Sequence, residues 1–367
     1  MTRRAANSKS PLRSSFHIDA RALRRRLLVW FDRHGRKDLP WQKSRDPYRI
    51  WVSEIMLQQT QVSTVIPYYE RFLKRFPTVQ ILARAKLDSV LHHWTGLGYY
   101  ARARNLKKAS EQIVREHGGQ FPHDIEAVSA LPGIGRSTAG AILAFAFDQR
   151  QPILDGNVKR VLTRLHAIET PISQRDTEST LWVLAGRYTP KTRVADYSQA
   201  IMDLGATVCR THKPACRLCP LTGDCRANAA GRPEDFPVRM PRKILPVRKT
   251  VMLMIRDTRG RVLLTQRPPV GLWGGLWSFP ECGSTARATR YCSESLGLRI
   301  QTGMPWPRLR HSFSHFHLDI TPLPAKLVDA ATLHETAPTV WLDPRRLHTI
   351  GFSAPVKEIL GRLRAKQ

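Results

Sequence analysis

The sequence predicts a larger all-α domain followed by a smaller domain of mixed α and β structure. From residue 23 to about residue 229, apolar residues recur at three- and four-residue spacing, and Gly and Pro separate the helix-like segments. Four prolines, interspersed with Arg and Lys, then fall within residues 231–247, as in an extended linker. Beyond the linker, β-prone runs at residues 250–255 and 261–265 flank a hairpin signal at 257–260. This change of pattern marks the second domain.

Composition favours a polyanionic partner. The 367 residues exceed what one hydrophobic core usually fills. An excess of 59 Lys and Arg over 29 Asp and Glu leaves a net charge of +30, which suits nucleic acid without distinguishing DNA from RNA. No apolar run reaches the roughly 18 residues of a membrane span, and no signal-type segment follows the N-terminus. We therefore expect a soluble, cytoplasmic protein that associates with the nucleoid.

The N-terminal stretch, residues 1–15, is basic, contains serines and lacks acids. A transit peptide and a disordered arm both fit this composition, but the amphipathic apolar face of a transit peptide is missing. We interpret residues 1–20 as a basic disordered arm. The expected domains are then 21–230 and 248–365, joined by the linker 231–247.

A Gly-rich turn at residues 131–137 leads directly into an apolar helix that begins near Thr138. The backbone N–H groups of such a turn and of a helix N-terminus can approach a phosphate closely. A Pro-Gly turn that only caps a core helix would look similar. Downstream, residues 155–160 read Asp-Gly-Asn-Val-Lys-Arg, and an Asp-Gly turn by itself is common.

Four of the six cysteines fall within one short segment: Cys209, Cys216, Cys219 and Cys225. Four thiolates gathered in one loop can ligate a [4Fe-4S] cluster. Zinc is the alternative metal, although structural zinc sites more often contain two C-x2-C pairs and only Cys216 and Cys219 form one here. Disulfides fit less well, because nothing indicates an oxidising compartment. We expect an iron-sulfur cluster in residues 209–225.

A helix-hairpin-helix followed by an aspartate and then by four cysteines resembles the endonuclease III superfamily, and in particular its MutY-type members with a Nudix-like C-terminal domain. In that superfamily the hairpin grips the DNA backbone, in many members with a bound monovalent cation, which implies DNA contacts by Gly133, Gly135 and Ser137. The resemblance also implies that Asp155 stabilises the oxocarbenium-like charge formed when the glycosidic bond breaks, and that Asn157 positions the attacking water.

Residues 51–62 resemble the segment that supplies the general acid in MutY-type enzymes. The resemblance implies that Glu54 protonates adenine at N7, which turns a poor leaving group into a neutral one. To hold a proton near neutral pH, Glu54 needs a pKa raised by burial or by a nearby carboxylate. Without the resemblance, Glu54 is simply a glutamate in the first turn of a helix, where the helix dipole favours it.

The same resemblance places Gln58, Gln59 and Thr60 in the duplex, against the base opposite the target. Leu97 and Tyr99, within residues 96–100, resemble wedge residues that fill the stack beside that base. A wedge has a physical purpose, because base extrusion costs a few kcal/mol of stacking that inserted side chains partly restore. A buried aromatic turn is the plain alternative for Leu97 and Tyr99.

Bifunctional members of the superfamily carry a hairpin lysine that attacks the sugar and then cleaves the strand. The matching position here is Ser137, so we expect a monofunctional enzyme in which water completes the reaction. Lys159 lies near enough in sequence to Asp155 for a weak, adventitious imine. Gln199 resembles an adenine-reading amide, although a surface glutamine on a helix fits the sequence equally.

The C-terminal domain resembles a Nudix-type fold at residues 271–280, but its hydrolase box is eroded. Hydrolysis needs a cluster of carboxylates for Mg²⁺, and residues 290–297 keep only Glu294. We expect this domain to bind an oxidised guanine without hydrolysing a nucleotide. Phe313, Ser314 and His315 resemble the loop that probes 8-oxoguanine. The alternating side chains of residues 311–317 fit a strand that uses both faces. A metal site is the alternative for the histidines in this segment.

Taken together, the resemblance implies a monomeric, monofunctional enzyme that removes adenine mispaired with 8-oxoguanine or guanine in double-stranded DNA. Two other classes remain as alternatives: a glycosylase-lyase acting on oxidised pyrimidines, and a non-catalytic DNA-binding protein that carries the cluster.

Overall fold

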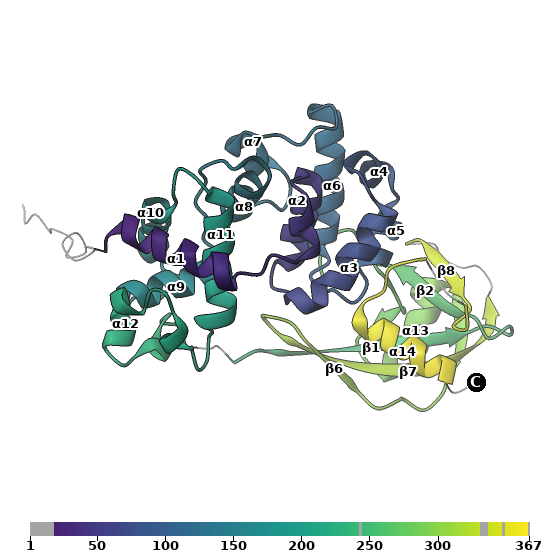
Figure 1. Ribbon diagram of the computed structural model, residues 1–367. Coiled ribbons are helices and arrows are strands. Elements are labelled where there is room, and N and C mark those ends of the chain that lie inside the picture. Colours follow the sequence, from purple (N-terminus) through teal and green to yellow (C-terminus); the bar gives the residue numbers. More distant parts are fainter. Residues whose placement is uncertain (1–17, 242–243, 331–336, 347–348, 366–367) are drawn as a thin grey trace, which may run out of the picture. The chain divides into compact units, whose positions relative to one another are not determined.

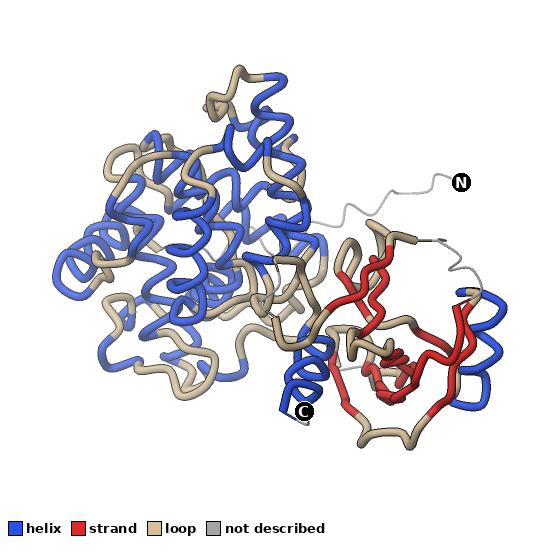
Figure 2. Tube along the Cα trace, turned by 90° about the vertical axis from the view of Figure 1, so that its right-hand side faces the viewer, coloured by secondary structure: helices blue, strands red, loops and turns tan. Residues whose placement is uncertain are grey.

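The computed structural model describes residues 18–241, 244–330, 337–346 and 349–365. It divides into two compact units, and the division does not follow the chain in a single step. One unit comprises the chain up to residue 54 together with 123–130 and 134–241; the other comprises 55–122, 131–133 and 242–367. Within the described residues every strand follows the linker, which confirms the predicted order of an all-α part and a mixed α and β part (Figures 1 and 2).

The first unit is helical around one apolar core. Helix α1 shows why: Leu23, Leu27 and Phe31 recur every four residues and are all buried on the same side. The tyrosine and leucines of α10 and the apolar faces of α9 and α11 complete the core. Its helices are α1 (Ala20–His34), the start of α2 (Pro47–Leu57), α7 (Ile125–Ala130), α8 (Arg136–Phe147), α9 (Gly156–His166), α10 (Arg175–Tyr188), α11 (Val194–Asp203) and α12 (Arg226–Ala229).

The expected N-terminal arm falls largely outside the described residues, which begin at 18. Its last residues are ordered, however. Asp19 caps α1 by accepting a hydrogen bond from the backbone N–H of Arg21 at 2.9 Å, so the helix begins at Ala20, inside the stretch expected to be disordered.

Four helices of the second unit precede the sheet in sequence. Helix α6 packs against both α4 and α5, and the rings of Phe72 and Trp94 meet edge to face with centroids 5.9 Å apart. The bounds are α3 (Val62–Arg75), α4 (Val79–Arg84), α5 (Leu87–Trp94) and α6 (Ala101–Glu116).

The sheet of the second unit is mixed, because β1 pairs in parallel with β7 and antiparallel with β2. The path β3-β2-β1-β7-β5 forms its body, while β4, β6 and β8 pair with β1, β7 and β2. Helix α14 (Ala354–Ala365) lies alongside the sheet in Figure 1. The strands are β1 (Val247–Arg256), β2 (Val262–Gln266), β3 (Trp277–Ser278), β4 (Glu281–Cys282), β5 (Leu298–Thr302), β6 (Leu309–Ser312), β7 (His317–Ala330) and β8 (Thr339–Leu342).

The predicted hairpin between the two β-prone runs is confirmed. Arg256 pairs with Val262, and the backbone N–H of Asp257 donates to the carbonyl of Arg261 at 3.0 Å. The linker is less free than its proline content predicts, since Phe236 is buried and its carbonyl accepts a hydrogen bond from Arg164 at 2.9 Å. Among the described residues, no helix is long and apolar enough to cross a membrane.

Candidate active site

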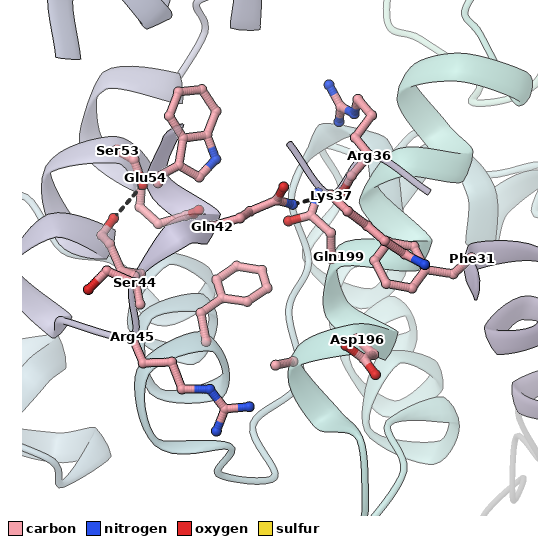
Figure 3. Close-up of a pocket in the computed structure, with 14 residues that line it drawn as sticks. Phe31, Arg36, Lys37, Gln42, Ser44, Arg45, Ser53, Glu54, Asp196 and Gln199 are labelled. Carbon is pink, nitrogen blue, oxygen red and sulfur yellow. Dashed lines mark hydrogen bonds between the residues drawn. The ribbon is translucent and has the colours of Figure 1, made fainter. Parts of the chain in front are cut away.

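A cavity of about 260 Å³ opens within the helical unit. It lies near the lower end of small-ligand sites, which start at roughly 300 Å³. Glu54 of α2 and Gln199 of α11 extend into it from opposite walls, as Figure 3 shows. The remaining lining residues include apolar rings and several cations: Phe31, Arg36, Lys37, Trp41, Gln42, Ser44, Arg45, Ile50, Ser53, Phe145, Ala195 and Asp196.

Glu54 belongs to the pocket because of the helix that carries it. The other sides of α2 carry buried apolar side chains, namely those of Trp51, Val52, Ile55 and Met56. Glu54 lies on the side of α2 that faces the cavity. Burial raises the pKa of Glu54 to about 8, and the negative charge of Asp155 contributes to the rise. The carboxyl group is therefore protonated at neutral pH, as its predicted role requires.

Asp155 occupies the N-cap of α9. Its side chain accepts hydrogen bonds from the backbone N–H of Val158 at 2.7 Å and from the amide of Asn157 at 3.1 Å. Burial raises the pKa of Asp155, and these hydrogen bonds oppose the rise because they stabilise the ionised form. The three predicted catalytic residues are thus linked: the charge of Asp155 acts on Glu54, and Asn157 donates a hydrogen bond to Asp155.

A chain of hydrogen bonds runs from Asp155 toward the cysteine loop. The oxygen of the Asn157 amide accepts from the guanidinium of Arg160 at 2.8 Å, and Nε of Arg160 donates to the carbonyl of Cys209 at 2.7 Å. The backbone approaches closely here, since a Cβ on Gly205 would lie 2.6 Å from that of Asn157. The sequence motif contained Arg160, but its bond to the cysteine loop depends on tertiary packing.

Ser137 and Lys159 occupy positions that bear on strand cleavage. The hydroxyl of Ser137 accepts a hydrogen bond from the backbone N–H of Leu154 at 2.9 Å, so it supports the chain directly before Asp155. Lys159 forms an ion pair with Glu178, with Nζ 2.7 Å from the carboxylate oxygen. The amine that was considered for an adventitious imine is therefore engaged elsewhere.

Gln199 is buried in the wall of the pocket and does not lie on the surface. Its amide nitrogen donates to Asp203 at 2.7 Å, and Asp203 also accepts from the backbone and from Nε of Arg36, at 2.8 and 2.9 Å. The bond to Asp203 uses one N–H of the Gln199 amide, and the side chain also lines the cavity. The sequence did not identify Arg36 and Asp203 as supports of Gln199, because neither residue belongs to a motif.

The predicted helix-hairpin-helix is confirmed as α7, a turn and α8. Gly133 adopts a φ of +81°, and a Cβ there would lie 2.8 Å from that of Asn105, so the turn requires glycine. Gly135 is the N-cap of α8 and makes no side-chain hydrogen bond there, and a helix N-terminus of this kind favours an anion. The guanidinium of Arg136 lies 4.0 Å from the ring of Trp182.

The four cysteines of the loop line one cavity of the helical unit. Burial raises the pKa of Cys219 to about 12, and the other three thiols add to the rise, so the sulfur atoms lie near one another. Among the residues that the structure describes, no three His, Cys, Asp or Glu side chains are gathered closely enough to hold one metal ion. The four thiols nevertheless line the same cavity, and thiolates are the usual protein ligands of an iron-sulfur cluster.

In the second unit, one buried arginine organises the two turns expected to enter the duplex. Arg102 donates to the carbonyls of Met56 and Gln58 at 2.7 and 2.6 Å, to that of Gly98 at 3.2 Å, and to the hydroxyl of Thr60 at 3.1 Å. The guanidinium thereby joins the end of α2 to the turn before α6. Burial lowers the pKa of Arg102 to about 10, so it stays charged.

The wedge turn, defined here as residues 96–99, presents one of its two expected wedge side chains. Tyr99 has a φ of +47° and is 52% exposed, whereas Leu97 is only 6% exposed. Gln59, with a φ of +56°, is also exposed at the end of α2. The structure therefore places Tyr99 and Gln59 at the surface, with Leu97 packed beneath them.

Phe313, Ser314 and His315 form a turn and not a strand, which corrects the expectation from alternation. The backbone N–H of Phe313 donates to the carbonyl of Phe316 at 2.9 Å and closes the hairpin between β6 and β7. Phe313 lies against the ring of Trp273 with centroids 5.3 Å apart, while Ser314 and His315 are exposed. We call residues 313–316 the hairpin tip.

The eroded hydrolase box lies on α13 (Ala288–Tyr291) and on the π-helix that follows it, Cys292–Leu296. Its single acid, Glu294, forms an ion pair with Arg290, with Nε 2.8 Å from the carboxylate. The segment 290–297 thus offers no cluster of carboxylates for Mg²⁺.

Comparison with known proteins supports a helical repair domain followed by a Nudix-type domain. Residues 52–187 match the family described as "HhH-GPD superfamily base excision DNA repair protein", and residues 251–362 match the NUDIX domain. A solved "thermostable thymine-DNA glycosylase" is similar with a TM-score of 0.52 and 25% identity, covering 57% of this chain and 97% of that one. A trapped endonuclease III–DNA intermediate, 21% identical with a TM-score of 0.50 over 58% of this chain and 99% of that one, shares the fold.

Two curated relatives extend the similarity over most of the chain. The adenine DNA glycosylase of Buchnera aphidicola subsp. Acyrthosiphon pisum (strain APS) is 37% identical, covering 91% of this chain and 95% of its own length. That of Homo sapiens is 34% identical over 94% of this chain and 76% of its own length.

The helix-hairpin-helix, together with the family match over residues 52–187, is that of a DNA glycosylase that acts in base excision repair. Given the identity and coverage of its relatives, the chain belongs to the adenine DNA glycosylase family. It is accordingly a hydrolase of N-glycosyl bonds, and the predicted resemblance is confirmed at this level.

Proposed function

We propose that the enzyme removes adenine mispaired with 8-oxoguanine or guanine, by extruding the adenine into the pocket of the helical unit. One observation carries the proposal: a carboxyl group with a pKa of about 8 faces the cavity beside a second, hydrogen-bonded carboxylate. Two carboxyl groups with different protonation states can serve as general acid and as stabiliser of positive charge.

In this mechanism Glu54 donates its proton to N7 of the extruded adenine, so that the base departs neutral. Asp155, held as an anion by the hydrogen bonds of Val158 and Asn157, stabilises the positive charge that develops on the sugar. Asn157 also orients the attacking water. The amide oxygen of Gln199 accepts a hydrogen bond from the exocyclic amine of adenine.

The product is an abasic site and an intact strand. Ser137 replaces the lysine of bifunctional relatives and is bonded to the backbone of Leu154. Lys159 is paired with Glu178. With no lysine at position 137 and the amine of Lys159 paired, water completes the reaction.

Lesion recognition belongs to the second unit. We assign contacts with the base opposite adenine to Gln58, Gln59, Thr60 and Tyr99, with Leu97 supporting the turn. The hairpin tip reads 8-oxoguanine: Phe313 is held against Trp273, and Ser314 and His315 are exposed to meet the base edge. Gly133 and Gly135 offer backbone N–H groups to phosphate in duplex DNA, which a monomer of the enzyme binds.

We propose that Cys209, Cys216, Cys219 and Cys225 hold a [4Fe-4S] cluster. The four thiols line one cavity, and Arg164 donates to the sulfur of Cys209 at 3.3 Å. When bound, such a cluster fixes the loop that follows α11 and supplies redox-active iron. Arg164 also donates to the carbonyls of Arg210 and Thr211, at 2.6 and 3.0 Å, and so supports the loop from the helical core.

A single-turnover assay tests the function. We expect adenine release to be fastest opposite 8-oxoguanine, slower opposite guanine and slowest opposite thymine, with little product trapped by borohydride. Release of thymine glycol with strong borohydride trapping would instead identify a glycosylase-lyase for oxidised pyrimidines.

A further inference from the structure

The C-terminal domain packs against α5 directly behind the wedge turn, through a short segment at residues 350–352. Nδ1 of His92 lies 3.4 Å from the carbonyl of Ile350, and the backbone N–H of Phe352 donates to the hydroxyl of Thr95 at 3.3 Å. The approach is close, since a Cβ on Gly351 would lie 2.8 Å from that of Leu91. Thr95 is the residue immediately before the wedge turn.

Tyr100, the residue immediately after the wedge turn, closes the same contact from the other side. Its hydroxyl donates to the carbonyl of Phe352 at 2.9 Å and accepts from the backbone N–H of Gly96 at 3.3 Å. The side chain is buried, and burial raises the pKa of Tyr100 to about 12, so the hydroxyl keeps the proton that it donates. One hydroxyl thus bonds both the wedge turn and the C-terminal domain.

A second bond connects the same helix with the hairpin tip. Arg104, one turn further along α6, donates to the carbonyl of Gly274 at 2.9 Å. The adjacent Trp273 contacts Phe313 of the hairpin tip, with ring centroids 5.3 Å apart. The N-terminal turn of α6 therefore bonds to two segments of the C-terminal domain, one behind the wedge turn and one beneath the hairpin tip.

We propose that Tyr100 is a positioning residue that holds the wedge turn in a fixed relation to the hairpin tip, so that both engage the same base pair. The inference rests on the proposed reading of 8-oxoguanine by the hairpin tip. Contact with the lesion then favours the inserted position of Tyr99, because both turns are bonded to one helix. Opposite guanine the hairpin tip makes no lesion contact. The bond from Tyr100 to Phe352 then does nothing to favour the inserted position of Tyr99.

Replacement of Tyr100 by phenylalanine removes only the hydroxyl and tests the proposal. One buried hydrogen bond is worth a factor of roughly 2 to 12, so we expect Tyr100→Phe to lower the ratio of single-turnover rates, opposite 8-oxoguanine over guanine, about 3- to 10-fold. The rate opposite guanine should stay nearly constant. A fluorescent 2-aminopurine beside the target should report less extrusion opposite 8-oxoguanine.

Two further variants make the test specific. Tyr188→Phe is the matched control, because its buried hydroxyl bonds to His166 at 3.0 Å within the helical unit. It should leave the rate ratio unchanged even if it lowers the melting temperature. If Tyr100→Phe does not fold, Thr95→Val removes the neighbouring bond to Phe352 and should lower the ratio in the same way.

Comparison with Ser314→Ala separates the possible outcomes. If the ratio in Ser314→Ala falls and adding Tyr100→Phe lowers it no further, the two residues act through one connection, as proposed. If Tyr100→Phe slows both substrates equally, or adds its full effect to that of Ser314→Ala, its role is only structural and the inference is overturned. If the unaltered enzyme shows no preference for 8-oxoguanine, the proposed function itself fails.

Discussion

At the scale of single residues, the proposed mechanism needs Glu54 to be protonated and Asp155 to be ionised at the same pH. Glu54 has two causes of a raised pKa, burial and the charge of Asp155, and both act in the direction of protonation. Asp155 experiences burial too, but it accepts hydrogen bonds from Val158 and Asn157 that favour the anion. This difference in hydrogen bonding supports the proposed roles of Glu54 as the acid and Asp155 as the anion.

The pH dependence of adenine release follows from the protonation of Glu54. Single-turnover rates should be level at neutral pH and fall about tenfold per pH unit above about 8, because the acid form is lost. At neutral pH, Glu54→Gln should reduce release by roughly 10²- to 10⁴-fold, and the difference should narrow above about pH 8 as the unaltered enzyme loses its acid form. A rate that instead rises through pH 8 would contradict the assignment.

The same raised pKa predicts a change in stability. A carboxyl group whose folded pKa exceeds its unfolded value favours the folded state below the unfolded value, and that contribution is lost as pH rises toward the folded value. Between about pH 4.5 and 8 the enzyme should therefore lose stability relative to Glu54→Gln, by about 2 kcal/mol after allowance for partial solvent access. Urea unfolding of both proteins across this range measures the difference.

Asp155→Asn should separate catalysis from folding. Asparagine is as good an N-cap as aspartate, so the bond to Val158 persists and the melting temperature should change little. Loss of the negative charge removes the stabilisation of the sugar cation, and release should fall roughly 10²- to 10³-fold. DNA affinity, measured by a gel shift with uncleaved duplex, should be largely unchanged. A large loss of affinity would show instead that Asp155 serves mainly to bind DNA.

At the scale of elements, two glycines of one hairpin should respond differently to alanine. Gly133 has a φ of +81° and no room for a Cβ beside Asn105, whereas Gly135 has a φ of −91° and nothing within 4 Å. Gly133→Ala should therefore lower stability by about 1–2 kcal/mol, and Gly135→Ala should not. Both should weaken DNA binding if the backbone approaches a phosphate. If both alanine variants lost the same stability, the positive φ and the lack of space at Gly133 would not be the cause of the loss.

Local pattern sufficed to predict the helix-hairpin-helix and the cysteine loop, because each depends on residues close in sequence. The bonds made by these elements were not predictable. Ser137 was identified as a DNA contact and as the residue in place of lysine, yet its hydroxyl also supports Leu154, seventeen positions away in sequence. Gln199 was equally plausible on the surface, because its burial depends on Asp203 and on Arg36 from a distant segment.

At the scale of the whole molecule, composition and periodicity predicted helices before strands, and this order is confirmed. They could not predict that residues 55–122 form one unit with the sheet, because that packing depends on contacts such as Tyr100 with Phe352 and Arg104 with Gly274. The alternation around His311 misled for a related reason: the backbone bond between Phe313 and Phe316 turns the chain where side-chain pattern alone suggests continuation.

The net charge of +30 leads to a prediction for the molecule as a whole. Each phosphate neutralised by Lys or Arg releases counterions, so affinity for undamaged duplex should fall steeply with salt, by roughly 10³-fold between about 50 and 200 mM if about six phosphates are contacted. The single-turnover rate with enzyme in excess should change little over the same range, because the buried carboxyl groups of Glu54 and Asp155 are screened less than exposed cations. Fluorescence anisotropy and release assays on the same duplex compare the two quantities. If the rate of the bound complex falls as steeply as the affinity, exposed charge and not the pocket governs catalysis, and the assignment of Glu54 and Asp155 would have to be abandoned.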